Sequence, residues 1–385
     1  MTLRRDRVFW TAALQIAIIN IYLGGFGPAQ SLLRAEQHTS LTVAGLHGTA
    51  MGIAAIISGF ANPHLVHRFG RQIASWIGFA FFGFGVLMFV FSPPVILTLS
   101  ATLIGGFGAS TVINTMVTQL SHHFPKDASA AVSQASGISS GGYLIGTLSV
   151  GAIASTSMSW RFGLLSVIPL ALILYFYSRP YISKEHVPHE DGPERGAMSI
   201  KFWIAWFGFI ACISTEFATT FWAAALVKDR VGSTAAVSTL SMLAFGIGMA
   251  SGRWFGPALL RELTLDSKLK SVLVFQFAGF SIFWFSHFMW LSLLTLFMMG
   301  IGISMQFALA SMRLIGLSDG RPELAIGRSS LAAGIAIAAA PFLLGVFGDH
   351  LGISRAYLMV PVLIVIALAT ILVIPSESPN LEASR

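Results

Sequence analysis

The chain has 385 residues, of which 55% are hydrophobic and only 10% charged, and its mean hydropathy is +0.76. A soluble domain usually carries about 25% charged residues, so this composition excludes an ordinary water-soluble protein. The formal net charge of +7 could indicate nucleic-acid binding, but the distribution of basic residues described below accounts for it without such a partner. The single cysteine, Cys212, excludes a disulfide framework.

The N-terminal segment begins with Arg4, Arg5 and Arg7 and then has no Lys, Arg, Asp or Glu before Arg34. A basic start is typical of a signal peptide, but this apolar run is too long and lacks a small-residue cleavage site. Because roughly 20 apolar residues cross a bilayer, we expect a retained first membrane helix over about residues 8–33.

Further apolar runs, bounded by charged or turn residues, predict eleven more membrane helices. In the first half they cover about residues 41–62, 72–91, 95–121, 129–155 and 161–178, and in the second half about 202–227, 234–260, 271–287, 289–312, 325–348 and 355–374.

The longest polar stretch, RPYISKEHVPHEDGPERGAMSI, separates these two sets of helices. We expect it to be a linker or a surface helix, because it is too short and too polar to form a domain. The predicted organisation is therefore a six-helix bundle over residues 1–178, a cytoplasmic linker over 179–200 and a second six-helix bundle over 201–385.

Basic residues are unevenly divided between the two faces that this topology predicts. Of the 23 Lys and Arg residues, 17 fall at the termini or in loops on the same side as the termini, five fall on the other side, and Arg253 lies inside a span. Lys and Arg accumulate in cytoplasmic loops of membrane proteins. We therefore expect both termini to be cytoplasmic.

The two halves also show internal similarity. The segment SGFANPHLVHR at 58–68 resembles SGRWFGPALLR at 251–261, and the small-residue run at 136–146 resembles the one at 333–345. A duplication of six plus six helices is the simplest explanation. In transporters built this way, substrate sites lie near the bilayer midplane between the repeats.

Twelve spans in two halves, a central linker and a basic hairpin after the second helix resemble the major facilitator superfamily of secondary transporters. The hairpin is similar to the family signature Gly-x-x-x-Asp-Arg-x-Gly-Arg-Arg, with Arg68, Gly70 and Arg71 at matching positions. The resemblance implies an all-α polytopic membrane protein, with twelve transmembrane helices in two pseudo-symmetric six-helix bundles. It also implies that Gly59 and the hairpin belong to a cytoplasmic gate.

The hairpin departs from the signature at the acidic position, where this chain has His67, and also at Pro63 and Gln72. The signature residues would form an ion-pair latch between the halves. Because a buried ion pair needs both partners and neutral His67 cannot supply the anion, we expect a weakened or rewired latch.

A weaker resemblance, to the fucose-permease-like branch, rests on AGLHGTAMGIAAIISG in the second helix and on Glu216, Trp222 and GMASGR in the seventh and eighth. The sugar symporters of that branch carry their proton-coupling carboxylates in the first and fourth helices. Those carboxylates are missing here, so we do not transfer the sugar substrate.

Two charged residues are predicted well inside membrane helices, where charges are costly and point to function. Glu216 lies near the middle of the seventh helix and is the candidate for proton coupling, with a hydrogen bond to a neighbouring helix as the structural alternative. Arg253 lies in the inner third of the eighth helix, where a gate or packing role is favoured over substrate contact.

Neutral polar and aromatic residues are candidates for a substrate cavity, because helices 1, 4, 7 and 10 surround the central path in this superfamily. Any one of them could instead form a hydrogen bond between helices. The candidates are Asn20, Gln30, Asn114, Gln119, Gln134, Trp222 and Gln306.

No catalytic or phosphate-binding motif occurs in the chain, so we expect neither an enzyme nor a cofactor. The pair His122 and His123 does not predict a metal site, because adjacent residues on a helix point apart and two ligands do not complete a coordination set.

These observations predict a secondary transporter that moves a small organic solute by alternating access, coupled to protons. The open alternatives are an uncoupled facilitator or exchanger, and a membrane sensor that keeps the fold without transport. The expected partners are a small-molecule substrate, protons and the lipid bilayer, but no nucleic acid. We expect a monomer in the inner (plasma) membrane of a bacterium.

Overall fold

The computed structural model describes residues 5–124, 128–182 and 196–376, and over these residues it contains helices and turns but no strand. The helices of the first half are α1 (Arg7–Phe26), α2 (Gln30–Gln37), α3 (Leu41–Phe69), α4 (Arg71–Phe91), α5 (Val95–His123), α6 (Ala128–Ala154), α7 (Arg161–Leu165), α8 (Val167–Ser178) and the 3₁₀ helix η1 (Arg179–Tyr181). Those of the second half are α9 (Ile200–Val231), α10 (Ala235–Leu259), α11 (Leu265–Phe285), α12 (Met289–Ile303), α13 (Gln306–Gly316), α14 (Pro322–Leu351), α15 (Ile353–Ala356) and α16 (Met359–Val373).

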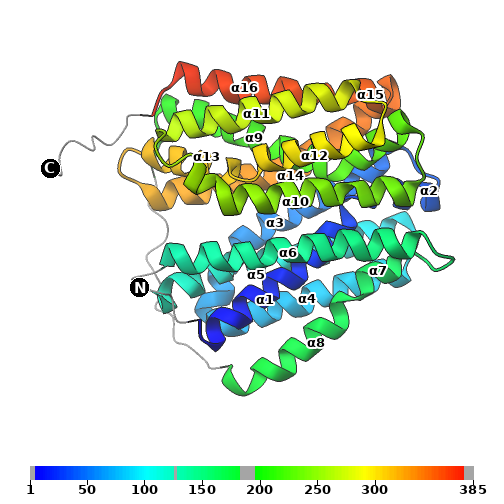
Figure 1. Cartoon of the computed structure of the whole chain (residues 1–385). Coiled ribbons are helices and arrows are strands. Elements are labelled where there is room, and N and C mark those ends of the chain that lie inside the picture. The colour runs from blue at the N-terminus through cyan, green and yellow to red at the C-terminus, as the bar shows by residue number, and fades with distance from the viewer. Residues whose placement is uncertain (1–4, 125–127, 183–195, 377–385) are drawn as a thin grey trace.

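Within the described ranges, twelve helical segments are long and apolar enough to cross a membrane, which confirms the predicted all-α polytopic fold. Three of these spans consist of consecutive shorter helices: α7, α8 and η1, then α12 and α13, then α15 and α16. The first-half helices lie together in one bundle and the second-half helices in another, with their axes running side by side (Figure 1).

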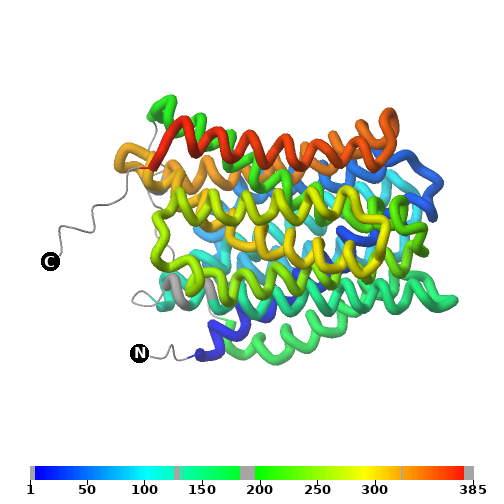
Figure 2. The backbone as a smooth tube through the Cα atoms, turned by 45° about the horizontal axis from the view of Figure 1, so that its top comes forward, coloured from blue at the N-terminus to red at the C-terminus, as the bar shows by residue number. Residues whose placement is uncertain are grey.

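Both bundles begin and end on the same side of the molecule, where the first turn of α1 and the last turn of α16 lie (Figures 1 and 2). We call this side the terminal face and the other side the opposite face. The turn between α3 and α4 lies on the terminal face, and the turn between α1 and α3, which contains α2, lies on the opposite face.

Hydrogen bonds from short polar side chains set the start of several helices. Each such side chain accepts a hydrogen bond from the backbone N–H three residues further on, which satisfies one of the free donors of a helix N-terminus. The capping residues are Asp6 for α1, Ser40 for α3, Ser199 for α9, Thr234 for α10 and Thr264 for α11.

Several predicted spans differ from the observed helices in their ends, and two of them show why. The span predicted at 8–33 is interrupted after Phe26, because Pro28 lacks an N–H and its ring disfavours continuation of the preceding turn. In contrast, α3 does not stop at residue 62 but continues through Pro63 to Phe69. It ends at Gly70, whose positive φ of 82° suits a residue without a side chain.

The two bundles meet along a seam formed by α3 against α14 and α6 against α10. Near the opposite face the α3–α14 contact is very close. A Cβ atom on Gly45 or Gly52 of α3 would overlap backbone atoms of α14, and a Cβ on Gly345 of α14 would overlap the backbone of Leu41. Small residues let helix backbones approach in membranes, so these glycines explain the tight packing.

Small residues also occur on these helices and on α6 closer to the terminal face, but there they have no close neighbour. A Cβ atom on Gly59 of α3, Gly137 of α6 or Gly327 of α14 would meet nothing within 4 Å. The seam is therefore closed at the opposite face and open at the terminal face.

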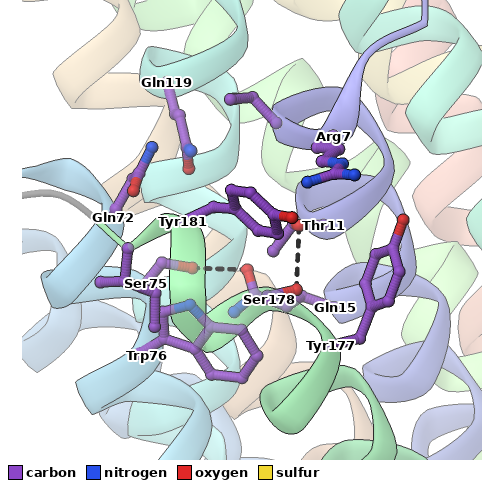
Figure 3. A pocket seen from close by; sticks show the side chains of 12 residues that line it. Arg7, Thr11, Gln15, Gln72, Ser75, Trp76, Gln119, Tyr177, Ser178 and Tyr181 are labelled. Carbon is purple, nitrogen blue, oxygen red and sulfur yellow. Dashed lines mark hydrogen bonds between the residues drawn. The ribbon is translucent and has the colours of Figure 1, made fainter.

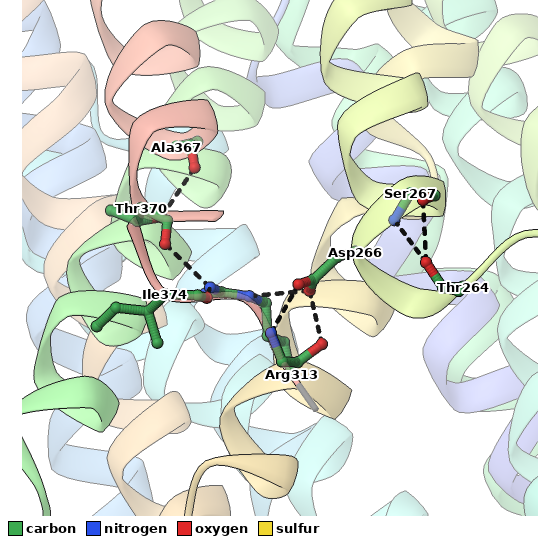
Figure 4. A network of polar contacts seen from close by, with 8 residues as sticks. Thr264, Asp266, Ser267, Arg313, Ala367, Thr370 and Ile374 are labelled. Carbon is green, nitrogen blue, oxygen red and sulfur yellow. Dashed lines mark hydrogen bonds and ion pairs between the residues drawn. The ribbon is translucent and has the colours of Figure 1, made fainter. Parts of the chain in front are cut away.

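Polar networks at the terminal face hold each bundle together internally. In the second bundle, Arg313 of α13 pairs with Asp266 of α11 at 3.2 Å and also donates to the carbonyl oxygens of Thr370 and Ile374 (Figure 4). In the first bundle, Asp6 accepts a hydrogen bond of 2.5 Å from His123 at the end of α5.

Candidate functional site

A cavity of about 80 Å³ lies between the two bundles, where α1, α3 and α6 face α9 and α10. Its apolar walls are Leu23, Phe26, Met51, Phe217, Phe221 and Met249. Its polar side chains are Asn20, Ser140, Tyr143, Glu216, Thr220 and Arg253.

Packing toward the opposite face closes the cavity on that side. The rings of Phe26 in α1 and Phe221 in α9 meet edge to face, with their centroids 5.9 Å apart, and thereby join the two bundles. Thr49 of α3 donates to the carbonyl oxygen of Ala338 in α14 at 2.9 Å, also across the seam. The cavity is thus bounded by the closed end of the seam.

Glu216 is the acidic residue of this cavity. It lies at the middle of α9, a helix of 32 residues, and its side chain is half-buried. Among the described residues no cationic side chain lies within 4.0 Å of its carboxyl group, although Arg253 acts on it electrostatically. A carboxyl group without a close cation can change its protonation state more readily than one in an ion pair.

Arg253 projects from α10 into the same cavity and is exposed there. Its Nη1 donates to the hydroxyl oxygen of Ser140 in α6 at 2.9 Å, and its Nε donates to the carbonyl oxygen of Ser304 at 3.4 Å. The first of these bonds crosses the seam between the bundles. Over the described ranges, no carboxylate forms an ion pair with this guanidinium.

Of the residues predicted for the substrate path, the structure brings Asn20, Glu216 and Arg253 together at this cavity. Asn20 Nδ2 donates to the backbone oxygen of Ile16 at 3.2 Å, so the side-chain amide also forms a hydrogen bond within α1.

Four other predicted cavity residues are buried or half-buried elsewhere in the bundles. Gln30 is fully buried and donates to the carbonyl oxygen of Phe26. Trp222 is fully buried and donates to the carbonyl oxygen of Pro341 at 2.9 Å. Gln306 donates to Gln276 Oε1 at 2.6 Å and to the carbonyl oxygen of Gly302, and Asn114 lies half-buried on α5 away from the cavity lining.

The last two predicted cavity residues lie near the terminal face of the first bundle. Gln134 accepts a hydrogen bond from Arg5 Nε at 2.9 Å. Gln119 lines a smaller pocket between α1, α4, α5 and α8, in which Ser75 donates to Gln15 at 2.7 Å and the hydroxyls of Thr11 and Ser178 are 3.1 Å apart (Figure 3).

The basic hairpin lies at the terminal face, at the end of α3 and the start of α4. His67 and Arg68 are exposed in the last turn of α3, where basic side chains complement the helix dipole, while Arg71 is buried in the first turn of α4. The expected weakening of the latch by His67 stays a prediction.

Of the histidine pair at the end of α5, His123 bonds Asp6 and so joins α5 to the start of α1 within the first bundle. Within the described ranges no group of three or more His, Cys, Asp or Glu side chains could hold a metal ion.

Sequence reasoning missed several residues of the cavity. Ser140 and Tyr143 lie in the run SGISSGGYLIG, which predicts close helix packing, and both line the cavity, while Gly142 and Gly146 of the same run pack on α1. Thr220 and Phe217 are placed one turn and one residue after Glu216 on α9. The spacing of four residues between Glu216 and Thr220 was a signal available in the sequence, because residues i and i+4 share a helix face.

Comparison with solved structures shows what this arrangement is similar to. A bacterial homologue of the human lysosomal transporter Spinster, in an inward-facing and occupied conformation, has a TM-score of 0.78 and 13% identity, covering 98% of this chain and 100% of that one. The nucleoside transporter NupG, as a point mutant, has a TM-score of 0.76 and 12% identity, covering 95% and 99%. At these identities the likeness shows the fold alone.

The unoccupied inward-facing form of the Spinster homologue is also similar, with a TM-score of 0.74, 12% identity and 96% coverage of both chains. Comparison with curated proteins finds no match. A family model, described as the Major Facilitator Superfamily, matches residues 9–315, which is most of the chain. Together with the twelve spans in two bundles, this match shows that the chain belongs to the Major Facilitator Superfamily.

Proposed function

We propose that this protein is a proton-coupled secondary transporter, which moves a small organic solute across the membrane by alternating access. The observation that carries the proposal is a cavity between the bundles that is closed at one end of the seam and contains a carboxyl group at mid-helix. An acid inside a membrane cavity is the usual mark of an ion or proton pathway. We further propose that the protein acts as a monomer.

The terminal face is cytoplasmic in this proposal, because the sequence assigns 17 of the 23 Lys and Arg residues to the termini and to the loops on the same side, and basic residues accumulate in cytoplasmic loops. The structure then corresponds to an inward-facing state in the inner membrane of a bacterium. The inward-facing conformation named for the Spinster homologue supports this assignment.

Glu216 carries the coupled proton. The side chain faces the cavity and interacts electrostatically with Arg253 without touching it, so its charge depends on what else occupies the cavity. A proton taken up there on one side and released on the other would connect solute movement to the pH gradient.

The test is Glu216→Gln, because glutamine keeps the shape and hydrogen bonding of the protonated acid but cannot release a proton. Purified protein in proteoliposomes is screened for uptake of radiolabelled organic acids, sugars and nucleosides under an imposed pH gradient, with empty liposomes as the blank. We expect Glu216→Gln to retain counterflow exchange and to lose gradient-driven accumulation.

Glu262→Gln is the matched control, since its side chain is 82% exposed at the terminal face. It should accumulate solute like the wild type. Retained driven uptake in Glu216→Gln, with unchanged pH dependence, would contradict the proton role and favour an uncoupled facilitator or exchanger. Absence of flux above empty liposomes for every solute would favour a sensor.

A further inference from the structure

The cavity contains one cation and one acid that face each other from neighbouring helices without forming an ion pair. We propose that its substrate is a small organic monoanion with one carboxylate on a flat apolar body. Arg253 binds the carboxylate, and the bundles reorient only when the anion and a proton on Glu216 are both present or both absent. This inference rests on the proposed function and deepens it.

Arg253 has the free donors that such a ligand needs. A guanidinium group has five N–H donors in a planar fork, which matches a carboxylate with two parallel hydrogen bonds. Two of its nitrogens contact neutral oxygens, those of Ser140 and Ser304, and neither contact compensates the positive charge. The sequence alone favours a gate or packing role, but the position of this side chain in the cavity favours an anion-binding role.

The rest of the lining selects the body of the ligand. Phe26, Phe217 and Phe221 present aromatic rings, and Met51 and Met249 add flexible apolar surface. Aromatic rings favour stacked or edge-to-face contacts with another flat group, and methionine adapts to irregular shapes. A sugar would place several hydroxyls against these apolar side chains, where they would lack hydrogen-bond partners.

Charge balance explains why the two binding events would be coupled. With the cavity empty, ionised Glu216 and Arg253 sum to zero. With the anion bound and Glu216 protonated, the charges again sum to zero. The anion alone leaves one negative charge, and the proton alone leaves one positive charge. An uncompensated charge enclosed within the membrane is costly, so closure of the cavity is disfavoured in both half-loaded states.

The neighbours of Glu216 are consistent with this counting. Among the described residues, the charged or titratable groups that act on it electrostatically are Arg253 of α10 and Tyr143 of α6. Asn20 of α1 and Thr220 of α9 are the neutral polar groups nearby in the lining. The cavity therefore contains a single cation to balance the acid and the ligand.

Binding is tested on purified protein by calorimetry and thermal shift, with benzoate and phenylacetate against benzamide and phenylacetamide. Each amide has nearly the shape of its acid but no charge. We expect the carboxylates to bind about tenfold or more tightly than the amides, since a hydrogen bond to a charged group is worth more than a neutral one. Arg253→Gln should abolish this preference.

Arg253→Lys should retain part of the preference, because lysine keeps the charge but not the planar fork. Arg261→Gln is the control. It removes a charge just after the end of α10, where the Arg261 side chain is 77% exposed, and the variant should bind the carboxylates like the wild type. Should Arg253→Gln fail to fold, the graded loss in Arg253→Lys decides. Equal binding of acids and amides, no binding of either acid, or an unchanged preference in both Arg253 variants would overturn the proposal.

Coupling is tested in proteoliposomes with radiolabelled benzenesulfonate, a strong acid that cannot carry a proton across the bilayer itself. A pH gradient, acidic outside the vesicles, should drive its accumulation, while a potential imposed with potassium and valinomycin should leave the rate unchanged. Glu216→Gln should exchange benzenesulfonate but not accumulate it. A rate that follows the potential would overturn the electroneutral scheme. Gradient-driven uptake of benzamide that depends on Glu216 would overturn the anion proposal and leave the proposed function intact.

Discussion

The two ends of the seam between the bundles differ in what crosses them. At the opposite face, the carboxylate of Asp349 at the end of α14 accepts the backbone N–H groups of Leu41 and Thr42, at 2.8 Å each, at the start of α3. A carboxylate at a helix N-terminus satisfies free donors and is favoured by the helix dipole. Polar contacts therefore join the two bundles at this end.

Among the described residues near the terminal face, the two ion pairs between helices lie within a bundle. Asp6 and His123 join α1 to α5 in the first bundle, and Asp266 and Arg313 join α11 to α13 in the second. Gly59 and its counterparts on α6 and α14 present small faces to nothing. The rows of small residues on these helices therefore extend beyond the part of the seam that is in contact here. A second state, closed at the terminal face, would need such rows for its helices to pack closely.

The largest effect is expected where the terminal face holds the second bundle together. Asp266→Asn leaves Arg313 buried without its counter-ion, and the side chain of Arg313 is only 3% exposed. Breaking a buried pair from one side costs about 3–5 kcal/mol. Thermal unfolding of the purified protein should show a clear loss of stability.

The control for this variant is Glu262→Gln, which breaks the neighbouring pair with Arg261. Those side chains are 82% and 77% exposed, so the loss should be within about 1 kcal/mol. Equal losses in the two variants would mean that the network around Arg313 does not stabilise the second bundle.

A smaller effect is expected from filling the seam at either end. Leucine at Gly52 would press into the backbone of Ala338 in α14, and overpacking typically costs about 1–3 kcal/mol, whereas leucine at Gly59 meets open space. We expect Gly52→Leu to open the seam at the opposite face. We expect Gly59→Leu to leave the present state unchanged but to prevent the seam from closing at the terminal face. Both should lose transport, for opposite reasons.

Labelling separates the two variants. A reporter cysteine replaces Ala29, which is fully buried near the opposite face, in a Cys212→Ala background. Its labelling should rise about tenfold or more in Gly52→Leu, as expected for a shift of about 1.4 kcal/mol, and should fall or stay the same in Gly59→Leu. The same labelling in both variants would remove the distinction between the two ends.

The contact of Asp349 with α3 is expected to contribute less. Asp349→Asn removes the charge and one of the two acceptors, which costs about 1 kcal/mol at a helix N-terminus and shifts the equilibrium about fivefold toward opening of the opposite face. Labelling of the Ala29 reporter measures the shift. Thr234→Ala is the control, because it removes the cap of α10 without a contact across the seam, and labelling there should not change.

Much of the fold could be predicted from the sequence, because the bilayer requires long apolar helices and the basic residues mark one face. Helix ends were harder to predict. The predicted end of α3 at residue 62 is too early, because a helix that leaves the bilayer can continue through polar residues such as His64. The helix α11 starts several residues before the predicted position 271. Its N-cap, Thr264, is a sequence signal that could have indicated this start.

The site was only partly predictable. Placing the charge of Glu216 or Arg253 against lipid would be costly, so their presence inside predicted spans indicates that both face a cavity or the bundle interior. Gln30 and Gln306 do not have this property, because an uncharged amide can be buried when its N–H group finds a nearby acceptor, and both donate to the carbonyl oxygen four residues earlier, in the preceding helix. Which face of the helix such a residue occupies depends on tertiary packing, which single-residue patterns do not contain.

The smallest effect is expected at the start of α1, where Asp6 caps the helix and bonds His123 within the first bundle. Burial raises the pKa of Asp6, but hydrogen bonds from the His123 side chain and the Phe9 backbone outweigh it and hold the pKa below its usual 3.8. A carboxyl whose pKa is lower in the folded state contributes stability above the unfolded pKa. That contribution is lost as the pH falls below about 3.8 through the folded value.

Two substitutions separate the roles of Asp6. Asp6→Asn keeps a good N-cap but loses the charge toward His123, and because both side chains are about 40% exposed the loss should be at most about 1 kcal/mol. Asp6→Ala should lose about 1 kcal/mol more with the cap. In thermal unfolding from pH 6 down to about pH 3, the deficit of Asp6→Asn should be full at pH 6 and shrink below about 3.8. A deficit that grows in acid, or changed labelling of the Ala29 reporter, would contradict a role confined to the first bundle.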